Sequence, residues 1–430
     1  MERFEGEQPL EQPLLSRAIS RRRMLQGSAV AGISAFLAAC GTAGTSPSAT
    51  AGRTGTPAGT GTADPTGGST DAATDAPSMT DGGQLGGELN FANWTAYIDL
   101  TETEDGEYVL PSPTLDQFTE ATGITVSYQE TINDNEEFFG TDLQGPLSQG
   151  VDTGWDIVVL TDFMAGRLIR LGWVEEIDTS GMENYPANLQ DQYKGRPIDP
   201  DTSFAAPWQS GMTGLGYDSE VTGELTSLDA LWDEQWAGRV TYLSDMRDAV
   251  GLSALRLGYP PEEITDEQFD EALAEIQSAV DAGIVRRFTG NDYLQDLTSG
   301  DAVLSMAWSG DMIQLQFDKE SARFEVPAEG GNLWTDNMLI PKGARNKAQA
   351  EAFIDFYYDP AIAAQVEAFV YYVCPVKGAR EAIAEIDEEA AESPLIFPTP
   401  EMVARLHGFR ALDEATEQRY QSAFNAVAGV

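Results

Sequence analysis

The chain has 430 residues, of which 70 are acidic and 25 basic, so its formal net charge is -45. This acidity argues against nucleic acid as a partner, because the phosphate backbone would be repelled. With 42% hydrophobic residues, the chain is long enough for two substantial globular lobes. A net charge of this size is also typical of a soluble protein with a well-solvated surface, so by itself it identifies no ligand.

The N-terminus predicts export. An apolar run from Met24 to Ala39 follows three arginines and is shorter than the roughly 20 apolar residues of a spanning helix. The run ends in "LAAC" at 37–40, which resembles a lipobox and implies cleavage before Cys40 and lipid attachment to its thiol. The segment "SRRRML" at 20–25 resembles the twin-arginine export pattern. We therefore expect residues 1–39 to be a signal peptide and the mature protein to be anchored outside the cytoplasmic membrane.

Residues 40–86 are expected to be a lipidated cysteine followed by a disordered tether. They consist almost wholly of Gly, Thr, Ala, Ser, Pro and Asp, which cannot bury enough apolar surface to fold. As a flexible coil, this segment would span roughly 40 Å.

The remaining cysteine and the single histidine predict neither a disulfide nor a metal centre. Once Cys40 is lipidated, Cys374 has no partner in the chain and is expected to be a small buried hydrophobe. His407 alone cannot form a His-cluster zinc site, so we expect no cofactor.

From Glu88 onward, short apolar strands alternate with helical stretches. The first strands are expected at 89–94, 124–130 and 155–160, with helices at 114–123 and 161–172. Further elements are expected as strands at 240–244, 302–310 and 330–341, and as helices at 266–283, 346–370, 380–393 and 414–427. This alternation predicts an α/β fold with two lobes around a cleft.

Several strand ends combine aromatic and acidic side chains, and ligands of open α/β sheets bind beyond such ends. The groups are Trp94 with Tyr97, Thr161 with Asp162, Asp245 with Asp248, Trp308 with Asp311, and Trp334 with Asp336. A linear polyamine needs this pairing, because its methylenes require apolar cover and its ammonium groups require carboxylates. We expect Asp336 to be a counter-ion and Trp334 the wall beside it.

Each of these residues also has a structural interpretation. Asp245, Asp248 and Asp311 stand at or near the expected starts of helices, where the helix dipole stabilises an acidic side chain. The tryptophans, read singly, are more often core residues. Asp336 fits its structural interpretation least, because an acid inside an apolar strand is costly unless paired.

The chain resembles the extracytoplasmic spermidine/putrescine-binding proteins of ABC importers, which have the two-lobed type II periplasmic-binding-protein fold. The motifs that carry the resemblance are "NWTAY", "WDIVV", "LWDEQWAGRVTYLSDMRDAVGLSALRLGY", "NDYLQDLTSGDAVLSMAWSGD" and "EGGNLWTDNMLIPKGARNKAQAEAF". It implies a non-enzymatic, monomeric protein that binds putrescine or spermidine and delivers it to a permease with its ATPase. It also implies a first lobe of 87–211 plus 336–380 and a second of 212–335 plus 381–430.

The resemblance places the ligand site on aromatic, acidic and hydroxyl positions. These are Trp94, Tyr97, Trp308, Trp334 and Tyr372 for the aromatic box, Asp245, Asp248 and Asp336 for the ammonium-binding acids, Asp311 for an acid of putrescine-type members, and Thr161 for a hydroxyl. Phe163 stands where the family has a tyrosine. Thr95 and Ala96 replace Ser and Asp of putrescine-type members, and Arg410 lies where the family's glutamine is not recognisable.

Two other interpretations remain open. Paired carboxylates with tryptophan platforms also describe glycoside hydrolases, although no spacing singles out an acid and a nucleophile. The same fold could instead bind a sugar, an amino acid or ferric iron, since the adjacent tyrosines 371–372 or 357–358 resemble those of ferric-binding relatives.

Overall fold

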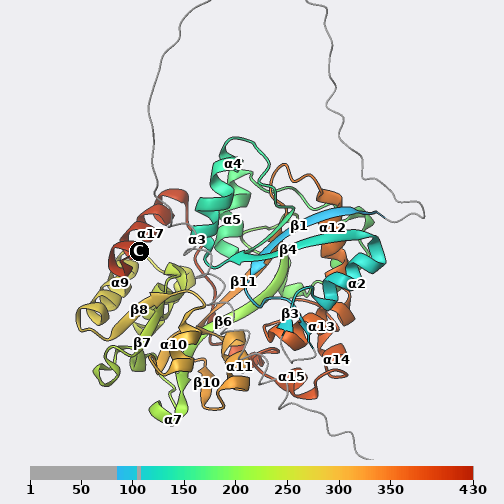
Figure 1. The fold of residues 1–430 in the computed structure, drawn as a ribbon. Coiled ribbons are helices and arrows are strands. Elements are labelled where there is room, and N and C mark those ends of the chain that lie inside the picture. The colour runs from blue at the N-terminus through green and yellow to red at the C-terminus, as the bar shows by residue number, and fades with distance from the viewer. Residues whose placement is uncertain (1–84, 104–107, 430) are drawn as a thin grey trace, which may run out of the picture.

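The computed structural model describes residues 85–103 and 108–429 (Figure 1). The predicted leader, Cys40 and nearly all of the predicted tether lie outside these described residues. Within them, strands and helices alternate as the sequence predicts, and the α/β fold class is confirmed.

One mixed sheet of ten strands runs through the molecule. Its main order is β4 (Ile124–Ile132), β1 (Gly87–Trp94), β5 (Ile157–Thr161), β11 (Gly331–Leu339), β6 (Ala206–Asp218), β9 (Leu304–Trp308), β7 (Val240–Leu243) and β8 (Val285–Thr289). The short strands β10 (Ala322–Glu325) and β12 (Leu406–His407) pair with β6 and β11. A separate two-stranded sheet consists of β2 (Thr101–Glu102) and β3 (Tyr108–Val109).

Strands β6 and β11 form an antiparallel pair at the centre of the sheet. Trp334 lies opposite Gly211, and Asp336 lies opposite Gln209. On the other side of β11, Asp336 lies opposite Thr161, the last residue of β5. The central pair therefore places Trp334 and Asp336 at the end of a neighbouring buried strand.

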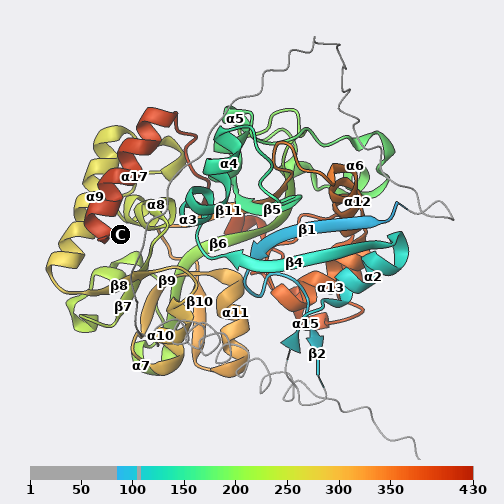
Figure 2. The same cartoon turned by 45° about the horizontal axis from the view of Figure 1, so that its top comes forward.

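Helices pack against the sheet and around its ends (Figures 1 and 2). They are α2 (Pro113–Thr122), α3 (Asn135–Phe138), α4 (Gln144–Ser148), α5 (Asp162–Leu171), α6 (Asn184–Asn188), α7 (Ser219–Thr222), α8 (Met246–Arg256), α9 (Asp266–Asp281), α10 (Tyr293–Ser299), α11 (Ser309–Asp318), α12 (Lys347–Tyr357), α13 (Pro360–Val370), α14 (Ala379–Ile383), α15 (Glu388–Glu392), α16 (Pro400–Val403) and α17 (Glu414–Ala428).

Aspartates begin many of these helices. The side chains of Asp134, Asp245, Asp359 and Asp413 each accept backbone N–H groups at the start of α3, α8, α13 and α17. Such caps satisfy donors that have no partner within the helix. Part of the acidic composition therefore has a local structural use.

Hydrophobic side chains gather in separate cores on the two sides of the central strand pair. One side buries residues from 89–208 and 334–379, and we call the elements around it the first half. The other buries residues from 212–326 together with Val373, Leu412, and Tyr420 and Phe424 of α17. We call the elements around it, apart from Val373, the second half. Helices α14 and α15 form a smaller cluster with α13, which Ile313 and Phe317 of α11 also contact.

The prediction of one continuous helix at 346–370 is wrong, because this segment forms two helices, α12 and α13. Asp359 caps α13, and Pro360 occupies its first turn, where its missing N–H and fixed φ are tolerated. The predicted helix at 380–393 is likewise two short helices, α14 and α15, separated at 384–387.

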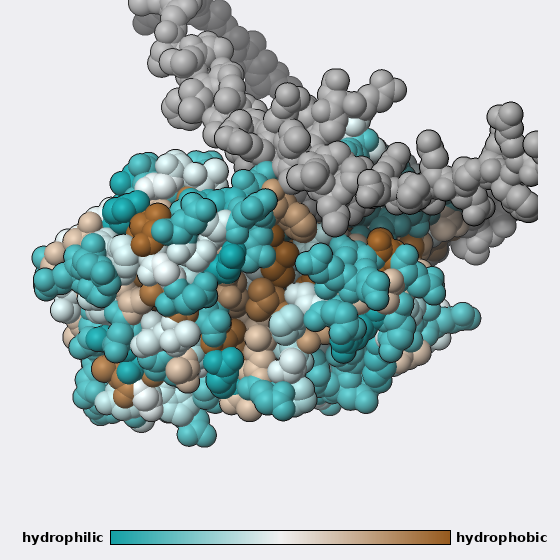
Figure 3. All heavy atoms as spheres, turned by 90° about the horizontal axis from the view of Figure 1, so that it is seen from below, coloured by the Kyte–Doolittle hydropathy of each residue, from teal (hydrophilic) through white to brown (hydrophobic). Residues whose placement is uncertain are grey.

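The face shown in Figure 3 is mostly hydrophilic. Seen from below, hydrophobic residues gather in a recess near the middle of the face (Figure 3). No helix within 85–103 or 108–429 is both long enough and apolar enough to cross a bilayer.

The close approach of Trp334 to β6 generates a first prediction. A Cβ at Gly211 would lie 2.3 Å from Trp334 Cζ2, so Gly211→Ala must displace the indole or the strand. We expect the free energy of unfolding to fall by about 1–3 kcal/mol in urea titrations. Gly145→Ala is the control, because a Cβ there meets no atom within 4 Å. Equal stability of the two variants would contradict this packing constraint.

Candidate functional site

A cavity lies where the two halves meet, with an empty volume of about 670 Å³ including its open mouth. Its walls come from strand ends and from the loops that follow them. The lining residues are Trp94, Thr95, Ala96, Tyr97, Asn133, Asp134, Asn135, Thr161, Ser244, Asp245, Asp248, Gly290, Asn291, Trp308, Asp311, Trp334, Asp336, Tyr372 and Phe409. Five of these are aspartates, and none is Lys, Arg or His.

The cavity brings together the sequence-predicted ligand residues with one exception. Those that line it are Trp94, Tyr97, Thr161, Asp245, Asp248, Trp308, Asp311, Trp334, Asp336 and Tyr372. Phe163 does not line it, because α5 already begins at Asp162 and Phe163 packs into the core of the first half. Arg410 also lies outside the lining, and its Nη1 donates to the carbonyl oxygen of Ile264 at 2.6 Å.

Asp336 is a buried residue of the cavity wall. Thr161 Oγ1 donates to its Oδ1 at 2.7 Å, and the Tyr97 hydroxyl donates to its Oδ2 at 2.9 Å. Asn135 Nδ2 in turn donates to Thr161 Oγ1 at 3.0 Å. The carboxylate thus receives hydroxyl donors in place of water, but no basic side chain contacts it within the described structure.

Asp248 lies between Trp308 and Trp334 in a chain of hydrogen bonds. Trp308 Nε1 donates to its Oδ2 at 2.9 Å, and Thr213 Oγ1 donates to its Oδ1 at 2.6 Å. Trp334 Nε1 donates to the same Thr213 hydroxyl at 3.0 Å. Both indoles therefore have their N–H groups fixed, and their centroids lie 6.3 Å apart at an interplanar angle of 76°.

Asp311, in the first turn of α11, accepts hydrogen bonds from three side chains. The Tyr372 hydroxyl donates to Oδ1 at 2.7 Å, while the Tyr293 hydroxyl and Asn291 Nδ2 donate to Oδ2, each at 2.9 Å. Gly310 makes room for Tyr372, whose ring lies 2.4 Å from where a Cβ would stand. The helix-acid interpretation and the site interpretation therefore both apply to Asp311.

Asp134 and Asp245 line the cavity from opposite halves and are helix caps. Asp134 Oδ1 accepts the backbone N–H groups of Glu136 and Glu137 at 2.8 and 3.0 Å. Asp245 Oδ1 accepts those of Arg247 and Asp248 at 2.8 and 3.3 Å. Capping uses one oxygen of each carboxylate, which makes the other available to a ligand.

Aromatic rings complete the wall. Trp94 Nε1 donates to the carbonyl oxygen of Val159 at 2.9 Å, which fixes that indole at the end of β1. The rings of Tyr97 and Tyr372 meet edge to face with centroids 5.1 Å apart, and Trp334 lies 5.6 Å from Tyr372. Such faces cover methylene groups and attract cations by about 0.5–2 kcal/mol.

The buried carboxyl groups have raised pKa values. Burial, together with the negative charges of Asp248 and Asp134, raises the pKa of Asp245 to about 8. Burial raises the pKa of Asp336 to about 7 against the opposing hydrogen bonds from Thr161 and Tyr97. The pKa values of Asp248 and Asp311 are also raised, again chiefly by burial. A cation in the cavity would favour the ionised form of all four groups.

Sequence reasoning missed several lining residues. Asp134, Asn133 and Asn135 follow β4, Asn291 follows β8, and Phe409 follows β12. All of them lie just beyond the end of a strand, and this position could have identified them. They were missed because none belongs to a group that combines an aromatic with an acidic residue. Asp and Asn at such places are also the usual helix caps.

The structure does not form a ferric site at Tyr357 and Tyr358. The hydroxyls of Tyr357 and Tyr358 donate to the backbone oxygens of Trp208 and Pro207 at 2.6 and 2.7 Å, inside the core of the first half. Across residues 85–103 and 108–429, no group of three or more His, Cys, Asp or Glu side chains could hold a metal ion. Cys374 is buried, as expected of a small hydrophobe.

An α/β protein with two packed halves and a cleft between them has the architecture of the periplasmic binding proteins. The model of the bacterial extracellular solute-binding protein family matches residues 114–398, and the chain belongs to this family. Family membership makes it a solute-binding protein and not an enzyme.

Named relatives agree with this assignment. The spermidine/putrescine-binding periplasmic protein of Escherichia coli K12 is 26% identical over 317 residues, which cover 73% of this chain and 84% of the relative. The structure of a spermidine/putrescine ABC transporter substrate-binding protein from Streptococcus pneumoniae superposes with a TM-score of 0.64 at 26% identity, covering 79% of this chain and 98% of that one. The Tp0655 lipoprotein of Treponema pallidum has the same fold, with a TM-score of 0.66 at 22% identity and coverage of 80% and 100%.

The raised pKa of Asp245 generates a stability prediction. The folded, ligand-free protein retains a proton there up to about pH 8, whereas an unfolded Asp loses it near pH 4, so stability falls as pH rises between these values. Asp245→Asn keeps the helix cap and removes this penalty. We expect its melting temperature to exceed the parent's by about 1–3 °C at pH 8 and by less at pH 5. A lower melting temperature than the parent's at pH 8 would contradict the prediction.

Proposed function

We propose that the protein captures a linear polyamine, putrescine or spermidine, and delivers it to the permease of an ABC importer. The observation that carries this proposal is a cavity lined by five aspartates and no basic residue, with tryptophan and tyrosine rings between them. A ligand for such a site must bring positive charges that are separated by apolar segments.

The donors around each aspartate support recognition of ammonium groups. Asp336, Asp248 and Asp311 are held in place by hydroxyl, indole and amide donors, so their orientation precedes ligand arrival. Dehydrating an ammonium group without a counter-charge costs several kcal/mol, and these carboxylates supply that charge. Trp94, Trp308 and Trp334 would cover the methylenes between the ammonium groups.

The likeness to spermidine/putrescine-binding proteins supports the same ligand class. It comes from relatives that align over most of the chain and from motifs that carry the aromatic and acidic residues of the cavity. Asp311 lines the cavity as an acid of putrescine-type members would, whereas Trp334 is the spermidine-type residue. A sugar or amino acid would leave several of these aspartates without a counter-ion.

We further propose that the two halves are the lobes of a hinged clamp. The lobes would comprise 87–211 with 336–380, and 212–335 with 381–430. Separate hydrophobic cores support this division, and the shared strands β6 and β11 support crossovers near Gly211 and Asp336. Closure around the ligand would bury it and present a surface to the permease, a two-state change driven by ligand affinity.

The cellular setting is also part of the proposal. Residues 1–39 would direct export by the twin-arginine route, which the segment 20–25 resembles, and Cys40 would carry the lipid anchor. The segment 40–86 would then tether a monomer at the outer face of the cytoplasmic membrane. A lipoprotein with the same fold exists in Treponema pallidum.

The role of Asp336 in ligand binding is tested by Asp336→Asn, which keeps its shape and removes its charge. We expect spermidine and putrescine affinity in calorimetry to fall by more than tenfold, because a charge-assisted interaction with an ammonium group is lost. Asp116→Asn, an exposed position on α2, is the control for the change in net charge. Affinity within twofold of the parent for Asp336→Asn would refute this role, and binding only of a sugar or amino acid from the same panel would refute the ligand class.

Polyamine affinity is expected to depend on pH. In the empty cavity Asp245 and Asp336 have pKa values of about 8 and about 7, while alkylammonium groups stay protonated to about pH 10. Binding must therefore release protons, and affinity should increase from pH 6 to pH 8.5. Calorimetry in buffers of different ionisation enthalpy measures the release, and proton uptake or a pH-independent affinity would contradict it.

A further inference from the structure

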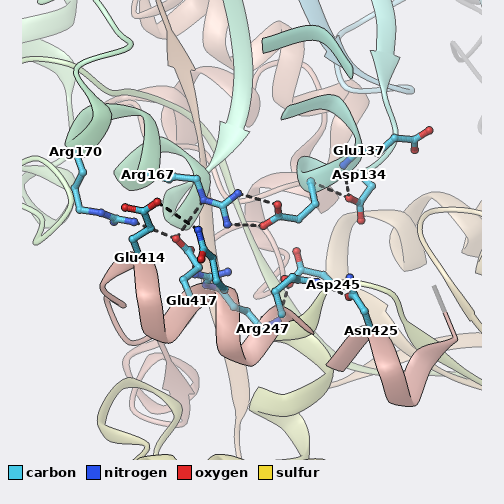
Figure 4. A network of polar contacts seen from close by, with 12 residues as sticks. Asp134, Glu137, Arg167, Arg170, Asp245, Arg247, Glu414, Glu417 and Asn425 are labelled. Carbon is cyan, nitrogen blue, oxygen red and sulfur yellow. Dashed lines mark hydrogen bonds and ion pairs between the residues drawn. The ribbon is translucent and has the colours of Figure 1, made fainter. Parts of the chain in front are cut away.

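Beside the cavity, ion pairs connect the two halves through Glu417 of α17 (Figure 4). The Glu417 carboxylate accepts Arg167 Nε at 3.2 Å and Arg170 Nη2 at 3.1 Å, both from α5. It also accepts Nη2 of Arg247, at the start of α8. Arg167 turns its other two nitrogens to Glu136 at 2.7 and 2.6 Å. We call these five residues the clasp.

Only part of the clasp joins one half to the other. Arg167, Arg170 and Glu136 belong to the first half, where α5 packs into its core, whereas Glu417 and Arg247 belong to helices of the second half. The Arg167–Glu136 and Arg247–Glu417 pairs therefore survive separation of the halves. The contacts of Arg167 and Arg170 with Glu417 exist only while the halves are together.

A second contact crosses the same junction. The guanidinium carbon of Arg247 lies 3.9 Å from the centroid of the Phe163 ring, and Phe163 belongs to α5 of the first half. Phe163 does not line the cavity, but its ring contacts the guanidinium group of Arg247 from the second half. Arg247 thus contacts the first half through an aromatic face and Glu417 through charge.

Burial makes the clasp stronger than ordinary surface ion pairs, which contribute little. Glu417 is 3% exposed and Arg247 is 7% exposed. Burial alone would raise the pKa of Glu417, but Arg247 and Arg167 outweigh it and lower that pKa. Loss of the Glu417 charge would leave buried guanidinium groups without their partner, which is costly.

The clasp is connected to the cavity by direct hydrogen bonds. Asp134 caps the backbone N–H of Glu136, and Asp245 caps that of Arg247, so each cavity carboxylate is fixed to a clasp residue. Figure 4 shows Asp134 and Asp245 next to the network. Asp134 belongs to the first half and Asp245 to the second, and the charge of Asp134 is one of the causes that raise the pKa of Asp245 to about 8. Closing the halves would therefore either bring two negative charges together or make Asp245 take up a proton, and both cost free energy. The contacts of Arg167 and Arg170 with Glu417 favour closure, and this cost opposes it until a cation lies between the two carboxylates.

We propose that Glu417 is the interlobe latch of the protein and that a cationic ligand releases the opposing repulsion between Asp134 and Asp245. The latch holds the lobes together once the ligand has entered, so it sets the lifetime of the complex. This proposal rests on the proposed function in one respect only, namely that the ligand is positively charged.

The first test compares Glu417→Gln with Glu414→Gln, an exposed position one turn earlier on the same helix. We expect spermidine to dissociate about tenfold faster from Glu417→Gln in stopped-flow measurements, with a small change in association, and within twofold of the parent rate from Glu414→Gln. Arg170→Gln, whose side chain is 43% exposed, removes one interlobe contact without a buried charge and should give a smaller increase in the same direction. Parent-like dissociation from both Glu417→Gln and Arg170→Gln would overturn the proposal.

The second test needs no polyamine. Distances between spin labels on α2 and α9 report the closed fraction of the ligand-free protein. Asp134→Asn keeps the cap and removes the repulsion, so it should increase the closed fraction, and combining it with Glu417→Gln should abolish that increase. An increase that persists in the double variant, or no increase at all, would overturn the latch. Failure of polyamine binding alone would refute the proposed function and leave this measurement intact.

Discussion

The ligand site depends on the free energy that it costs to remove aspartate side chains from water and to hold them close to one another. Five aspartates line one cavity, and the three deepest receive donors from hydroxyl, indole or amide groups and no basic side chain. Neutral donors fix a carboxylate without cancelling its charge. Burial, together with the charges of neighbouring carboxylates, raises the pKa values of Asp245 and Asp336. The charge that no basic side chain cancels defines what a ligand must contribute.

The aromatic residues serve this arrangement in two ways. Tyr97 and Tyr372 turn their hydroxyls to Asp336 and Asp311 while their rings form the wall. Trp308 and Trp334 use their N–H groups on Asp248 and Thr213, so their faces stay available. Apolar cover and polar support thus come from the same side chains, which explains why aromatic and acidic residues recur together at the strand ends.

Much of the fold and most of the site could be predicted from sequence, because both depend on local patterns. Alternating strands and helices gave the α/β class, and an acid inside an apolar strand singled out Asp336. The Asp359–Pro360 break was missed because apolar spacing continues across it. Phe163 was predicted at the site because it stands where the resembling family has a tyrosine, but it lies in the first turn of α5 and packs into the core. The pairing of Arg167 with Glu417 joins residues 250 positions apart, and no local pattern signals it.

The two strands shared by both halves determine how those halves can move. Because β6 and β11 pair from Asn332 to Met338 with one irregularity between Asp336 and Asn337, the halves stay joined through this ribbon, and the proposed lobe motion would be a flexing about it. Trp334 and Asp336 lie on this ribbon and would therefore move least in the proposed closure. Asp245 caps the start of α8 in the second half, so an incoming ligand would meet Trp334 and Asp336 as a stationary platform, and Asp245 would close onto it afterwards.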